Sequence, residues 1–103
     1  MQQSGSIYLV SCVSQKRERA CAARDLYISD WFVKARRYAE ASGHPWFILS
    51  AEYGLVPPDR VVAPYERTLN TMGAAKRRAW AERVVHQLVE AVPDLSHVVF
   101  LAG

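Results

Sequence analysis

Short apolar runs alternate with longer segments of helical periodicity along this chain. The apolar runs cover residues 7–10, 46–49 and 97–101; each is too short for a helix and is rich in strand-forming residues. Between them, apolar residues recur at helical spacing over residues 29–42 and about 73–92, with charged residues on the opposite faces. The pattern therefore predicts the order strand, helix, strand, helix, strand.

Residues that start and stop helices support this division. The hydroxyl of Ser29 can cap the first helix, and Gly43 fits its C-terminal end. Asn70 or Thr71 can cap the second helix, and Pro93 ends it.

Short strands that alternate with amphipathic helices predict an α/β fold with a parallel sheet and right-handed crossovers. We expect three layers, α/β/α, in the order β-α-β-α-β. A sheet of three strands is small, and the pattern breaks off at residues 101–103. The chain is therefore interpreted as the N-terminal part of a single longer domain, with residues 1–6 as a flexible leader. Further residues or self-association with another chain would complete the sheet.

Composition narrows the class of protein. The chain has 103 residues, of which half are hydrophobic, and this is enough for one domain with a core. Thirteen basic and ten acidic residues give a net charge of +3, which permits an anionic partner without requiring one. No apolar run is long enough for a signal peptide or a membrane span, so we expect a cytoplasmic protein with no membrane partner.

The two cysteines do not suggest a metal centre. Cys12 and Cys21 lie nine positions apart, whereas zinc sites usually pair cysteines two to four residues apart. The three histidines do not supply a second ligand pair. The sequence therefore predicts no metal and no other cofactor.

A long loop follows the strand at residues 46–49. Three prolines restrict its backbone, and it carries apolar side chains such as Leu55, Val61 and Val62. Gly54 can adopt a positive φ or let a ligand approach the backbone closely. Such a segment is too apolar for disorder. We interpret it as an ordered loop that leaves the carboxyl end of a central strand.

Candidate functional residues follow the first two strands, because ligands in parallel sheets bind beyond the carboxyl ends of the strands. Glu52 is placed to act as a general base, and Lys16 to hold a phosphate. The tyrosines could stack on a nucleobase, or pack within the loop with their hydroxyls on backbone groups. Cys12 could be a nucleophile or a small buried residue. The candidate ligand-binding residues are Ser11, Cys12, Ser50, Tyr53, Gly54 and Tyr65.

Three short basic clusters lie at residues 16–19, 34–37 and 76–78. Such clusters are usually solvated faces of the protein. Two clusters on one surface would form a footprint for a phosphate backbone.

The central segment resembles the YaaA peroxide-stress protein family. The shared signature consists of Leu49-Ser50, Tyr53-Gly54, Pro58 and Pro64-Tyr65, and Ser11 and Lys16 match more loosely. A small family of uncharacterised bacterial domains is more similar still, through Val10-Ser11-Cys12, Lys16 and residues 23–27.

The YaaA resemblance implies DNA binding, a role in limiting oxidative damage, and a core similar to that of uracil-DNA glycosylases. This chain departs from the family in two respects. Cys12 replaces a proline of the family, and the helix-hairpin-helix insertion is not visible.

Three functional hypotheses follow. The first is a pocket for a nucleobase, a nucleotide, DNA or RNA at the strand ends, in a glycosylase-like enzyme or a DNA-binding stress protein; an extruded base would stack on Tyr53. The second is a non-catalytic binding or assembly domain, in which the tyrosine–proline loop is a structural brace. The third is a thiol-dependent enzyme that uses Cys12.

Overall fold

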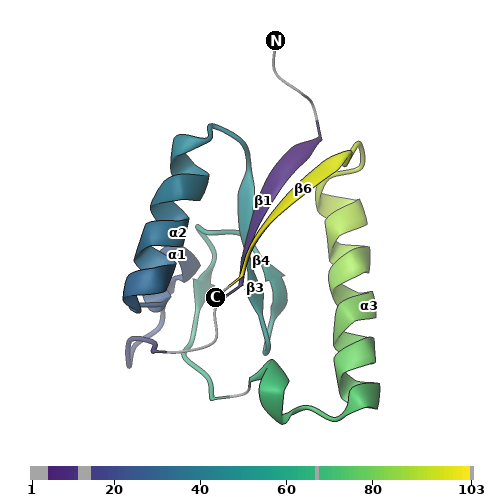
Figure 1. The fold of residues 1–103 in the computed structure, drawn as a ribbon. Coiled ribbons are helices and arrows are strands. Elements are labelled where there is room, and N and C mark those ends of the chain that lie inside the picture. The colour runs from purple at the N-terminus through teal and green to yellow at the C-terminus, as the bar shows by residue number, and fades with distance from the viewer. Residues whose placement is uncertain (1–4, 12–14, 67, 103) are drawn as a thin grey trace.

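A mixed four-stranded sheet forms the centre of the molecule. The computed structural model describes residues 5–11, 15–66 and 68–102. The strand order is β4-β3-β1-β6, in which β1 runs parallel to both of its neighbours and β4 runs antiparallel to β3 (Figure 1). The four strands are β1 (Ser6–Ser11), β3 (Trp46–Ser50), β4 (Gly54–Val56) and β6 (His97–Ala102).

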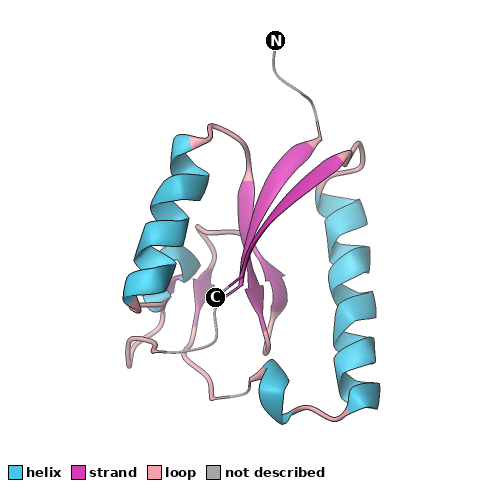
Figure 2. Ribbon diagram, viewed as in Figure 1, coloured by secondary structure: helices cyan, strands magenta, loops and turns pink. Residues whose placement is uncertain are grey.

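Helices lie on both sides of the sheet, with α2 on one side and α3 on the other (Figures 1 and 2). A second, two-stranded sheet pairs β2 with β5. None of the described helices has the length and apolar character needed to cross a bilayer. The remaining elements are β2 (Cys21–Ala22), α1 (Ala23–Leu26), α2 (Asp30–Ala41), β5 (Val61–Val62), the 3-10 helix η1 (Leu69–Thr71) and α3 (Ala74–Ala91).

The predicted α/β class and the order of the three main strands and two main helices are confirmed. The prediction of a wholly parallel three-stranded sheet is wrong. The segment after Ser50 turns back and pairs with β3 as β4, because Gly54 takes a positive φ of 75° that closes the turn. The segment interpreted as a loop therefore contains two strands, β4 and β5.

Three of the four predicted helix ends agree with the structure: α2 begins after Ser29 and ends before Gly43, whose φ is 76°, and α3 ends before Pro93. The Ser29 hydroxyl accepts a hydrogen bond from the amide of Phe32 at 3.2 Å, as predicted for the start of α2. The predicted cap of α3 is wrong, because Asn70 and Thr71 lie in η1. The N-cap position of α3 is Gly73, which provides no side-chain hydrogen bond.

The core has two parts, one on each face of the sheet. The α2 face includes the fully buried side chains of Val10, Phe32 and Ile48. The α3 face is thinner: among the residues of α3, Val84 is the buried one, and Val85 and Val89 are more than half exposed. The two faces are therefore unequally covered.

Arg36 joins α2 to α1 on the thicker side. Its guanidinium donates to the carbonyl of Arg24 at 2.8 Å and contacts the carboxylates of Asp25 and Glu40 at 3.0 and 3.2 Å. Partial burial lowers the pKa of Arg36, but the hydrogen bonds to these carboxylates outweigh it and the pKa is raised. The charge on Arg36 is thus retained while it fastens the two helices.

Phe32→Ala tests the core on the α2 face. The side chain is fully buried, so the substitution removes apolar contacts and leaves a cavity. We expect the free energy of unfolding to fall by about 3–5 kcal/mol in urea titrations. Val33→Ala is the matched control, since Val33 is 36 % exposed, and it should change stability by about 0.5 kcal/mol or less. Equal losses for both variants would contradict this assignment of the core.

Candidate ligand-binding site at the carboxyl ends of the strands

The carboxyl ends of β1 and β3 lie on the same side of the sheet. The two strands are parallel neighbours, and their register places Ser11 beside Leu49. The carboxyl ends of β1 and β3 therefore lie side by side, as expected for parallel neighbours. Cys12 lies outside the described residues, so the proposals made for it remain untested.

Ser50 builds the turn between β3 and β4. Its side chain is fully buried, and its hydroxyl accepts hydrogen bonds from the amides of Glu52 and Tyr53 at 3.2 and 3.0 Å. Its carbonyl accepts from the indole N–H of Trp80 at 2.8 Å. These contacts give Ser50 a structural role in the turn, while its predicted contact with a ligand remains untested.

Side chains of α3 hold the turn from the outside. Arg83 donates to the carbonyls of Glu52 and Tyr53 at 3.3 and 3.0 Å. The side-chain oxygen of Gln87 accepts from the amide of Leu55 at 2.8 Å, and its nitrogen donates to the carbonyl of Tyr53 at 3.4 Å. Together with Trp80 these side chains form what we call the α3 clamp, which consists of Trp80, Arg83 and Gln87.

Two observations explain why position 54 is a glycine. Its φ of 75° lies in the region that favours glycine. A Cβ atom at this position would collide with the side-chain oxygen of Gln87. The close approach to the Gly54 backbone, which the sequence suggested for a ligand, is made here by a side chain of the protein.

The tyrosines of the central segment pack on one another beside the turn. The rings of Tyr53 and Tyr65 meet edge to face at 5.6 Å between centroids, and the hydroxyls of Tyr65 and Tyr27 lie 2.6 Å apart. The Tyr53 hydroxyl donates to the carbonyl of Ala63 at 3.2 Å. These contacts favour the packing alternative for both tyrosines over base stacking.

Two cations lie against these rings. The ammonium of Lys16 is 4.4 Å from the centroid of Tyr65, and the guanidinium of Arg60 is 5.4 Å from that of Tyr53. Lys16 and Tyr53 therefore both lie against the ring of Tyr65. Lys16 also lines a wide, open depression of about 640 Å³, together with Gln15, Arg17, Glu18, Pro64, Tyr65 and Glu66.

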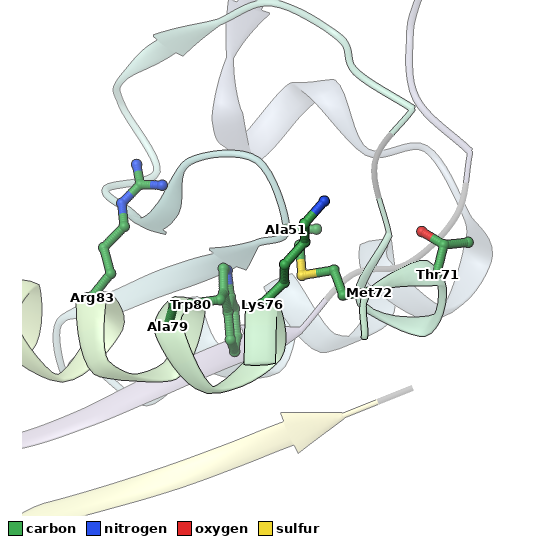
Figure 3. A pocket seen from close by; sticks show the side chains of 7 residues that line it. All are labelled: Ala51, Thr71, Met72, Lys76, Ala79, Trp80 and Arg83. Atoms are coloured by element: carbon green, nitrogen blue, oxygen red, sulfur yellow. The ribbon is translucent and has the colours of Figure 1, made fainter. Parts of the chain in front are cut away.

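A separate cavity lies on the α3 side of the turn, immediately after the carboxyl end of β3. Its volume is about 470 Å³, and Figure 3 shows its lining. Two of its side chains, Lys76 and Arg83, are cationic, and none of the described side chains that line it is acidic. The lining residues are Ala51, Thr71, Met72, Lys76, Ala79, Trp80 and Arg83.

The electrostatics of this cavity favour an anion. Arg83 is fixed by its hydrogen bonds to the turn, so its charge has a defined position. Within the described part of the chain, Lys76 has no carboxylate within ion-pair distance. An unpaired cation beside a fixed one in a partly enclosed space attracts negative charge.

The sequence predicted a site at this end of the strands and did not include residues of α3 in it. By sequence, Trp80 falls within the helical periodicity of residues 73–92, and Lys76 falls within the basic cluster at residues 76–78. The available signal was the spacing of Trp80, Arg83 and Gln87, which places three hydrogen-bond donors on neighbouring positions of one helix face. Among the residues that the structure describes, no three His, Cys, Asp or Glu side chains gather where they could hold a metal ion.

Gln87→Ala tests the α3 clamp. The substitution leaves the amide of Leu55, a residue that is 5 % exposed, without its acceptor. We expect a loss of about 1–3 kcal/mol in the free energy of unfolding, measured by urea titration. His86→Ala is the control on the exposed side of the same helix and should stay within about 0.5 kcal/mol of the parent. An unchanged stability in Gln87→Ala would show that the clamp is dispensable.

Comparison with known proteins corrects the resemblance drawn from the central segment. A model described as "Family of unknown function (DUF6884)" matches residues 7–103, and no YaaA family model matches the chain. The prediction of YaaA membership is therefore wrong. The signature at residues 49–65, on which it was based, also occurs in this chain of a different family. No curated protein and no solved structure matched the chain. The chain belongs to DUF6884, a family of unknown function.

Proposed function

We propose that this domain binds a phosphate-bearing ligand of the nucleotide class, either a free nucleotide or a nucleic-acid strand, in the cavity beside the α3 clamp. The proposal rests on one observation: the cationic side chains of Lys76 and Arg83 line the same cavity at the carboxyl end of β3. This edge of a parallel β-α-β unit is where such folds usually bind ligands.

The start of α3 adds to the positive character of the cavity. Thr71, Met72 and Lys76 line it on either side of Gly73, the N-cap position. The first turn of α3 contains no acidic residue and has no side-chain cap. Helix N-termini carry partial positive charge, so this end of an 18-residue helix favours the same ligand charge as the two side chains.

Trp80 supports the choice of a nucleotide over a simple inorganic anion. Its indole lines the cavity, and its N–H bond to the carbonyl of Ser50 fixes the ring in place. A fixed aromatic ring can stack on a base, and such contacts contribute about 1–3 kcal/mol per base. The cavity thus combines cations for a phosphate with an aromatic surface for a base.

The proposal is one of binding, without assigned catalysis. Glu52 contributes backbone groups to the turn, and Lys16 lines the other depression, so the catalytic roles predicted for them have no support from this cavity. The relation to the uracil-DNA glycosylase core and the nucleic-acid type remain predictions. The alternative of an assembly domain is supported at one point, the internal packing of Tyr53 and Tyr65.

Lys76→Met tests the proposed site through the affinity for a fluorescein-labelled single-stranded oligonucleotide. Losing one charged contact should weaken binding roughly tenfold at low salt and reduce the salt slope by about one. Lys34→Met, on the exposed surface of α2, is the matched control because it changes the net charge equally. A nucleoside monophosphate should compete with the oligonucleotide, whereas the nucleoside without its phosphate should compete much less.

Two results would overturn the proposal. One is the absence of binding to oligonucleotide and to nucleoside monophosphate at low salt by the folded protein. The other is an equal loss of affinity in Lys76→Met and Lys34→Met, which would indicate non-specific attraction by net charge.

A further inference from the structure

A line of contacts connects the cavity beside the α3 clamp to the open depression that Lys16 lines. Arg83, which lines the cavity, donates to the carbonyl of Tyr53 at 3.0 Å. The centroid of the Tyr53 ring lies 5.4 Å from the guanidinium of Arg60 and 5.6 Å from the centroid of Tyr65. The ammonium of Lys16 lies 4.4 Å from the centroid of Tyr65 and thus completes the line. Cationic side chains therefore follow one another from one depression to the other.

The charges of these side chains are available to a ligand. Within the described residues, neither Lys16 nor Arg60 has a carboxylate within ion-pair distance. Arg60 is exposed and Lys16 is half-buried. We call this set the cation row, and it consists of Lys76, Arg83, Arg60 and Lys16.

A single nucleotide in the cavity does not reach the whole cation row. Lys16 and Arg60 are not among the side chains that line the cavity, and the contacts that connect them to Arg83 run through Tyr53. The chain at residues 15–19 and the helix η1 nevertheless both lie toward the end of the sheet at which β1 and β3 finish (Figure 1). A ligand that carries phosphates at successive positions can therefore contact several of these cations at once.

The geometry points to a single-stranded nucleic acid as the ligand, an inference that rests on the proposed function of the cavity. One nucleotide occupies the cavity, and its neighbours cross the Tyr53–Tyr65 pair toward Lys16. The strand has to be single, because a base reaches the indole of Trp80 inside the cavity only when it is unpaired. RNA and DNA share this chemistry.

The depression at the far end of the cation row fits the bases as well as the phosphates. Glu18 and Glu66 line it together with Lys16. Their carboxylates repel phosphates, but they can accept hydrogen bonds from the amino groups of bases. The exposed guanidinium of Arg60 can stack on a base or contact a phosphate between the two depressions. The surface between the cavity and Lys16 thus offers partners to both parts of a strand.

Isothermal titration calorimetry at low salt tests the inference through the length of the ligand. The ligands are thymidine 5′-monophosphate and thymidine oligonucleotides of about 4, 8 and 12 nucleotides, with the uridine series as the RNA arm. In at least one series the affinity should rise by about tenfold or more from the monophosphate to the longest strand, because further phosphates meet further cations. Pairing the longest strand with its complement should weaken binding, since the bases are then no longer free to enter the cavity.

Variants of the cation row separate the strand from the single nucleotide. Lys16→Met and Arg60→Met should each weaken binding of the longest strand roughly fivefold and reduce its salt slope by about 0.7, while the affinity for the monophosphate stays unchanged. Arg37→Met is the matched control, because it removes the same charge from the exposed surface of α2 near its carboxyl end, beyond which β3 begins. Circular dichroism checks that each variant is folded.

The results distinguish failure of this inference from failure of the proposed function. A monophosphate that binds as tightly as the longest strand in both series would overturn the inference and leave the cavity site intact. Equal losses in Lys16→Met, Arg60→Met and Arg37→Met, or equal affinity for the single strand and its duplex, would also overturn it. Absence of binding to every ligand would overturn the proposed function together with the inference.

Discussion

The contact between α3 and the β3–β4 turn is the interaction on which the rest of this structure depends. Trp80, Arg83 and Gln87 form hydrogen bonds with the backbone groups of four turn residues, Ser50, Glu52, Tyr53 and Leu55. A side-chain bond to backbone groups does not depend on the identity of the turn residues, except where space is limiting, as at Gly54. The turn, the fourth strand and the position of α3 are thus set together.

This contact divides the strand-end region into two parts with different roles. On one side, Tyr65 packs against Tyr27 and Tyr53 packs against Tyr65, and these contacts fasten the central segment to the α2 half of the core. On the other side, the cavity shares Arg83 and Trp80 with the α3 clamp. Of the side chains proposed to meet a ligand, Trp80 and Arg83 are held by hydrogen bonds before binding, which lowers the entropic cost of association. Trp80 and Arg83 are held mainly by their hydrogen bonds to the turn. Apolar packing contributes less, since Val84 is the buried residue of α3.

The sequence predicted what depends on local pattern and missed what depends on long-range contacts. Strand and helix positions followed from periodicity, and the Ser29 cap followed from residue chemistry. The antiparallel strand β4 was missed because a three-residue strand after a glycine has no periodic signal, and its pairing with β3 is held by Gln87 from 32 positions away. The YaaA resemblance failed because it relied on residues that build a turn and a tyrosine cluster, and such residues report local structure rather than function.

The most direct test of the central claim is hydrogen exchange at the amides of Tyr53 and Leu55 in Trp80→Phe, a variant that keeps the aromatic ring but loses the N–H donor to Ser50. If α3 positions the turn, these amides should exchange markedly faster than in the parent, while the β1 amides keep their protection. Unchanged protection of the turn amides in a folded Trp80→Phe chain would contradict the account, because the turn would then hold its shape without that bond.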